Sequence, residues 1–103
     1  MCQSKITRKV IITNSEGLHA RAATLVAEMV RRFEARVKLA KDCEGVEGTD
    51  VLQILSLGAA QGEQLMLEAT GEDAERVLDA LIDLFASNFA ENGENSEEAE
   101  NQP

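Results

Sequence analysis

The sequence is poor in aromatic residues, with no Trp, no Tyr and only three Phe among its 103 residues. Proteins that bind nucleic acids stack bases on aromatic rings and hold phosphates with clustered Lys and Arg. Here 10 Lys and Arg stand against 19 Asp and Glu, which gives a formal net charge of −9. Both features argue against a nucleic-acid partner.

Long apolar segments and paired cysteines are missing as well. The sequence contains no run of about 18 apolar residues, the length needed to cross a membrane. Residues 1–8 are polar and lack the apolar segment of a secretory signal. We therefore expect a cytoplasmic protein with no membrane partner. Cys2 and Cys43 lack the spacing of a zinc site or a disulfide framework, so we expect reduced thiols and no bound metal.

Length and charge distribution predict one folded domain and a tail. A chain of 103 residues can form one core, since two would each be too small. Residues 91–103 contain five Glu and no Lys or Arg, with too few apolar side chains to offset the entropy of ordering. We predict a domain over residues 1–90 and a disordered acidic tail over 91–103, either solubilising or partner-binding.

Apolar periodicity predicts seven elements in the order β-α-β-β-α-β-α. Alternation predicts strands over 5–13, 35–39 and 65–70, with a short third strand near Val46. A helix is predicted over 20–33, with an apolar stripe formed by Leu25, Val26, Met29, Val30 and Phe33. Asp73 opens the last helix, whose apolar positions are Ala74, Val77, Leu78, Leu81, Ile82 and Phe85. Such elements predict a two-layer α+β sandwich with one sheet face covered and the other facing water.

A short helix predicted over 51–57 is apolar on nearly all sides. Thr49 and Asp50 are capping residue types before it, and Gly58 ends it. A two-turn helix on a surface can bury only one side, so some of its apolar residues should be exposed as a docking patch. The candidates for this patch are Val51, Leu52 and Leu55. The alternative is that a loop covers them.

The single histidine, His19, marks the candidate site, where the first strand gives way to the first helix. The first N–H groups of a helix lack intrahelical partners and favour an anion. A neutral imidazole could attack phosphorus while the backbone N–H groups of Ala20 and Arg21, with the Arg21 guanidinium, hold phosphoryl oxygens. Gly17 would supply backbone freedom at the turn. Alternatively, His19 is a surface or capping residue.

Residues 17–23 read Gly-Leu-His-Ala-Arg-Ala-Ala, which resembles the phosphorylation-site signature of the HPr family, Gly-Leu-His-Ala-Arg-Pro-Ala. Phe33, the Leu-Gly pair at 57–58 and the Gly-Glu-Asp turn at 71–73 also fall where this family has similar residues. The resemblance covers residues from about 5 to 89.

The resemblance implies both a fold and a reaction. The fold is an open-faced sandwich, with a four-stranded sheet in the order 1-4-2-3 and three helices on one side. In the reaction, enzyme I, phosphorylated from phosphoenolpyruvate, passes a phosphoryl group to Nδ1 of His19, and the carrier gives it to an enzyme IIA protein. No cofactor is implied, and we expect a monomer. Residues 84–89 and 68–71 resemble the nitrogen-type paralogues, so sugar uptake and a regulatory relay both remain open.

Two positions depart from the family pattern. Ala22 replaces the usual Pro, which restores a backbone donor and loses some preorganisation. Asp50 stands in place of the regulatory serine that HPr kinase phosphorylates, and a carboxylate cannot accept that phosphate. Asp50 is either a regulatory charge or only a helix cap. From the family arrangement we expect the two helix starts, at His19 and Asp50, to lie near each other.

Two other functions compete with the phosphoryl carrier. One is a regulatory binding module that uses Asp50 and the patch around Leu52 on a regulatory partner, with little phosphotransfer. The other is a stand-alone enzyme, which is poorly supported because His19 and Arg21 lack a second acid/base partner or a metal cluster. We interpret Glu16 as a solvated loop charge rather than a general base.

Overall fold

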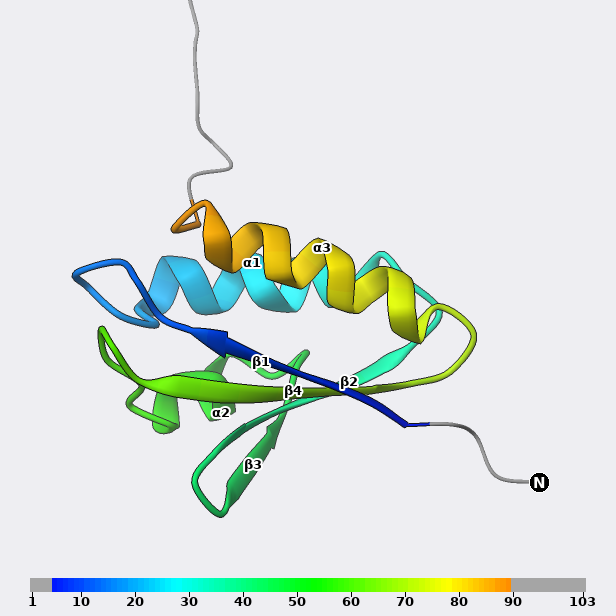
Figure 1. Cartoon of the computed structure of the whole chain (residues 1–103), viewed down its shortest axis with the longest axis horizontal. Helices are drawn as coiled ribbons and strands as arrows, with labels where there is room; N and C mark the ends of the chain where they lie inside the picture. Colours follow the sequence, from blue (N-terminus) through cyan, green and yellow to red (C-terminus); the bar gives the residue numbers. More distant parts are fainter. Residues whose placement is uncertain (1–4, 90–103) are drawn as a thin grey trace, which may run out of the picture.

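A computed structural model of the protein describes residues 5–89, which form seven elements in the predicted order (Figure 1). The strands are β1 (Ile6–Ile11), β2 (Arg36–Lys41), β3 (Glu44–Glu47) and β4 (Gln64–Thr70). The helices are α1 (Ala20–Arg31), α2 (Val51–Ser56) and α3 (Ala74–Ala86). None of these helices is long and apolar enough to cross a membrane. The acidic tail predicted over 91–103, like Cys2, lies outside the described residues.

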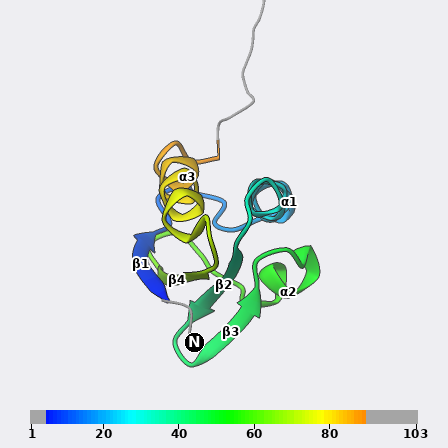
Figure 2. The ribbon, with the colours of Figure 1, turned by 90° about the vertical axis from the view of Figure 1, so that its right-hand side faces the viewer.

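The four strands form one antiparallel sheet in the order β1-β4-β2-β3. The register places Val10 opposite Leu65 and Leu39 opposite Leu67, so apolar side chains align across three strands. Figure 2 shows all three helices on the same side of the sheet, with the other face uncovered. The predicted open-faced sandwich and its strand order are therefore confirmed.

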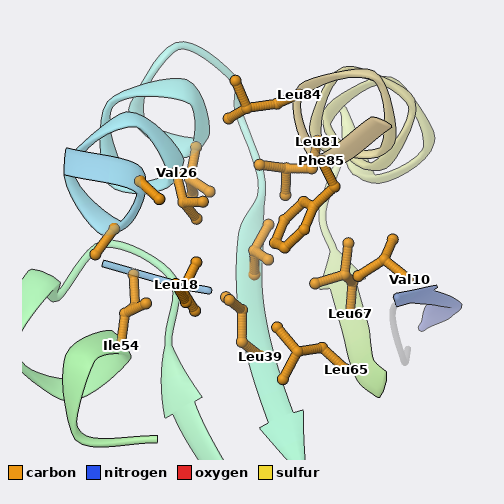
Figure 3. Packing of buried hydrophobic residues seen from close by; sticks show 14 of the residues in the cluster. Val10, Leu18, Val26, Leu39, Ile54, Leu65, Leu67, Leu81, Leu84 and Phe85 are labelled. Atoms are coloured by element: carbon orange, nitrogen blue, oxygen red, sulfur yellow. The ribbon is translucent and has the colours of Figure 1, made fainter. Parts of the chain in front are cut away.

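Because the helices cover only one face of the sheet, buried and partly exposed residues alternate along the strands. In β4, Leu65, Leu67 and Ala69 are buried, whereas the residues between them are half-buried on the uncovered face. Side chains from the helices and the sheet meet in a single core (Figure 3). The labelled members of this core include Val10, Leu18, Val26, Leu39, Ile54, Leu65, Leu67, Leu81 and Phe85.

Helix α1 confirms the predicted apolar stripe only in part, at Val26 and Val30. Its buried residues are Ala22, Ala23, Val26, Ala27 and Val30, and α1 ends at Arg31, two residues early. The other members of the predicted stripe, Leu25, Met29 and Phe33, are only half-buried. Small side chains allow a closer approach to α2 and α3, the elements nearest to α1, so the alanine-rich face turns inward and the larger residues line its margin. In α3 the prediction is confirmed except that Leu84 is buried and Ile82 is half-buried.

Helix α2 lies beside α1 and runs in the opposite direction. Arg31 Nη2, at the end of α1, donates to the carbonyl oxygen of Thr49 before α2, at 2.9 Å. The backbone N–H of Leu18, just before α1, donates to the carbonyl oxygen of Ala59 after α2, at 3.0 Å. The expectation that the helix starts lie together is therefore wrong. Asp50 lies at the far end of α1 from His19, and a 12-residue helix spans roughly 18 Å.

Candidate functional site

The candidate site lies at one end of the molecule, where three connections meet: residues 12–19, residues 57–63 and the residues that end α3 (Figure 1). Gln61 Nε2 donates to the carbonyl oxygen of Thr13 at 3.1 Å. The Thr13 hydroxyl in turn donates to Asn88 Oδ1. Because Leu18 is also bonded to Ala59, the loop before α1 is held on both sides.

Gly17 fixes the shape of this loop. Its φ of +67° lies in the left-handed region, and a Cβ built there would be 2.6 Å from the carbonyl oxygen of Ala59. The Gly17 carbonyl accepts from Asn14 Nδ2 at 2.8 Å, which closes the turn. The need for glycine here is confirmed, because any side chain would combine backbone strain with a clash against backbone.

His19 is the N-cap of α1. Its backbone is extended (φ −78°, ψ −179°), its carbonyl accepts from the Ala23 N–H at 2.8 Å, and its Nδ1 accepts from the Ala22 N–H at 3.2 Å. A neutral imidazole nitrogen that accepts a hydrogen bond carries the lone pair, so the ring proton belongs on Nε2. Of the two ring nitrogens, Nδ1 is therefore the one that carries a lone pair. The capping role, given above as an alternative for His19, is confirmed.

The remaining edges of the imidazole contact a carboxylate and an aromatic ring. Glu16 Oε1 lies 3.6 Å from Nε2, although the Glu16 side chain is 76% exposed, as a loop charge should be. The Phe89 ring meets the imidazole edge-on, with centroids 6.4 Å apart, and Phe89 itself packs against Phe85 at 4.9 Å. The ring is thus supported on two sides while 29% of the His19 side chain stays exposed.

The start of α1 keeps several donors unused. Within residues 5–89 the backbone N–H groups of Ala20 and Arg21 have no hydrogen-bond acceptor, and both residues are exposed. The Arg21 guanidinium likewise forms no ion pair with any residue in that range. Two backbone donors and one cation therefore lie in the first turn of the helix that His19 caps, where an anion is favoured.

Glu63 anchors the connection that contacts Gly17. Its Oε1 accepts from the Ala60 N–H at 2.7 Å and pairs with Lys41 Nζ at 3.2 Å. The Ala60 hydrogen bond, followed by Lys41, holds the pKa of this carboxyl below its ordinary value. The carboxylate form therefore stabilises the position of the connection, and this contribution is lost only as the pH falls through the lowered pKa.

The proposed docking patch is exposed at one residue. Leu52 is 78% exposed, so no loop within residues 5–89 covers it. Val51 and Leu55 are half-buried beside the core, and Ile54 is fully buried. Asp50 caps α2 through Oδ1, which accepts from the Gln53 N–H at 3.1 Å.

The contact between Phe89 and His19 was not predicted from the sequence. It depends on a chain reversal after α3, where Asn88 and Phe89 have φ values of 58° and 62°. Asn directly after a helix commonly adopts this left-handed conformation, so Asn88 was the available signal. For the contact between Glu16 and His19 Nε2, the sequence offers no indication except that the two residues are three positions apart.

Most of the chain is similar to known phosphocarrier proteins. Residues 6–87 match the family described as the PTS HPr component phosphorylation site. The chain is 42% identical over 88 residues to phosphocarrier protein NPr of Escherichia coli K12, covering 84% of this chain and 97% of that protein. Phosphocarrier protein HPr of Cupriavidus necator is 31% identical over 86 residues, with the same coverages. The crystal structure of HPr-C-His from Thermoanaerobacter tengcongensis superposes with a TM-score of 0.78 at 36% identity, covering 82% of this chain and 94% of that one.

Proposed function

Since the chain belongs to the HPr family of phosphocarrier proteins of the phosphotransferase system, we propose that it carries a phosphoryl group on Nδ1 of His19. One observation supports this most directly. His19 caps a helix start with its lone-pair nitrogen, and the unused N–H groups of Ala20 and Arg21 lie in the next two residues. Four consecutive residues thus supply the proposed site: the nucleophile is His19, the anion-binding donors belong to Ala20 and Arg21, and the Ala22 N–H is bonded to Nδ1.

In the proposed reaction the Nδ1 lone pair forms a bond to phosphorus. The bond between phosphorus and the donor breaks, and its electron pair leaves with the donor. Nε2 keeps its proton beside Glu16, while the Ala20 and Arg21 N–H groups and the Arg21 guanidinium stabilise the charge on the phosphoryl oxygens. In the second step an acceptor nucleophile attacks phosphorus, and Nδ1 recovers its lone pair.

The partners that fit this role are enzyme I as donor and an enzyme IIA-type protein as acceptor. Identity is higher to NPr, at 42%, than to the Cupriavidus HPr, at 31%. Together with the resemblance of residues 68–71 and 84–89 to nitrogen-type carriers, this favours a regulatory relay over sugar uptake. A binding module with little phosphotransfer is not favoured, because His19 and Arg21 are both retained.

Incubation of the protein with phosphoenolpyruvate and a cognate enzyme I should add one acid-labile phosphoryl group per chain. Addition of an enzyme IIA-type protein should then discharge it. Intact-protein mass spectrometry before and after acid treatment measures both steps. Acid-stable labelling, or no labelling while a known carrier is labelled by the same enzyme I, would refute the proposal.

We also propose that the patch of Leu52, Val51 and Leu55 contacts enzyme I. Replacing Leu52 with Glu should weaken this association by about tenfold to a hundredfold, because burying a Leu side chain in an interface contributes about 1.5 to 3 kcal/mol. The melting temperature should change little, since the side chain is 78% exposed. Calorimetric titration with enzyme I and thermal unfolding measure the two effects.

The matched control is Ile11→Glu. Ile11 is the other exposed large hydrophobic residue of the described chain, 54% exposed at the end of β1, and the substitution changes the net charge equally. It should leave the affinity for enzyme I unchanged. Equal weakening by both variants would show that added negative charge, not the Leu52 patch, lowers the affinity.

A further inference from the structure

The Ala22 backbone N–H forms a hydrogen bond to Nδ1 of His19, the nitrogen that must react in the proposed transfer. It donates to His19 Nδ1 at 3.2 Å, and this nitrogen has only one lone pair with which to accept a hydrogen bond. Phosphorus must form its bond with the same lone pair. The hydrogen bond therefore has to break before, or as, the Nδ1–phosphorus bond forms.

The Ala22 N–H cannot simply turn away once this bond is broken. The Ala22 side chain is fully buried, and residue 22 is the third residue of α1, so its backbone direction is fixed by the helix. A donor left without an acceptor at such a position is costly. After transfer, the nearest new acceptor is an oxygen of the phosphoryl group, because this group is bonded to Nδ1, the atom that accepted the Ala22 hydrogen bond before.

We propose that the Ala22 N–H is a switching donor, bonded to Nδ1 in the resting protein and to a phosphoryl oxygen in the phosphorylated protein. The proposal rests on the proposed transfer through His19. The proton stays on the Ala22 nitrogen throughout, and only its acceptor changes. The bond to a charged phosphoryl oxygen is the stronger of the two, since charge-assisted hydrogen bonds are about twice as strong as neutral ones.

This switch has two opposed effects on the carrier. Holding Nδ1 lowers its reactivity before the donor arrives, whereas the new bond stabilises the phosphohistidine afterwards. Because the second bond is stronger, the net effect favours the phosphorylated form. The family signature has Pro at this place, which carries no N–H, so Ala22 adds a donor to those of Ala20 and Arg21.

Two variants remove the donor in different ways, and a third retains it. Ala22→Pro deletes the N–H but adds a ring, and an ester linkage at residue 22, introduced by semisynthesis, deletes the N–H without a ring. Ala22→Ser changes the side chain and keeps the N–H. If the Pro variant disturbs the helix start, the ester still tests the proposal.

The resting state is tested by nitrogen NMR of the His19 imidazole. In the wild type and in Ala22→Ser, Nδ1 should show the chemical shift of a hydrogen-bonded acceptor. In Ala22→Pro and in the ester it should move to the shift of a free acceptor. An unchanged Nδ1 shift in both donor-less proteins would overturn the resting half of the proposal.

The phosphorylated state is tested after loading His19 with phosphoramidate, a small phosphoryl donor that needs no partner protein. The phosphohistidine should hydrolyse roughly three to ten times faster in Ala22→Pro and in the ester than in the wild type, with Ala22→Ser unchanged. Equal hydrolysis rates in all four proteins would overturn the switch. Failure of enzyme I to label the wild type would refute the proposed function alone, because chemical loading does not depend on it.

Discussion

Replacing His19 with Ala should abolish phosphoryl uptake from enzyme I while the protein remains folded. His19 is the only histidine of the chain, so no other imidazole can take its place. The cost to folding should be limited to the lost N-cap hydrogen bond, about 1 kcal/mol. Mass spectrometry after incubation with phosphoenolpyruvate and enzyme I measures the loss, and circular dichroism checks the fold.

A second substitution separates the nucleophile from the cap. Asn is a good N-cap residue, so in His19→Asn its side-chain oxygen can accept from the Ala22 N–H as Nδ1 does in the native protein. This variant should recover most of the melting temperature lost in His19→Ala and still carry no phosphoryl group. A labelled His19→Asn protein would place the acceptor on another residue and end the carrier assignment through His19.

Replacing Arg21 with Ala should slow phosphoryl transfer about tenfold or more with little change in stability. A charge-assisted hydrogen bond to the phosphoryl group contributes roughly 1.5 to 3 kcal/mol when it is made in the transition state. Arg21 is exposed and forms no ion pair within residues 5–89, so folding loses little. Rapid-quench kinetics with phosphorylated enzyme I measures the transfer rate.

Arg32→Ala is the matched control for this measurement. Arg32 is an exposed arginine at the other end of the same helix, so its loss changes the net charge equally but leaves the start of α1 unaltered. Its transfer rate should stay near that of the wild type. If both variants are slowed alike, the effect is long-range attraction of the partner, and Arg21 does not contact the phosphoryl group.

Local periodicity was sufficient for much of the fold. The alternation of Leu65, Leu67 and Ala69 predicted the buried face of β4, and the spacing of apolar residues in α3 predicted all but one of its core positions. The buried face of α1 was predicted only in part, because the alanines that line it beside Val26 and Val30 gain little by burial on their own. Their burial depends on how closely α1 can approach α2 and α3, which no local pattern encodes.

The sequence by itself determined the order of the elements, the place of His19 at a helix start and the Arg21 and Ala22 positions beside it. All of these follow from residues within one or two turns of each other. Only the tertiary structure decided that the Ala59 carbonyl lies close to Gly17 and that Phe89 packs against the His19 ring. It also decided that Asp50 lies at the far end of α1. These contacts join segments that are about 20 to 70 residues apart, so they depend on the antiparallel path of the chain and on core packing, which local periodicity does not specify.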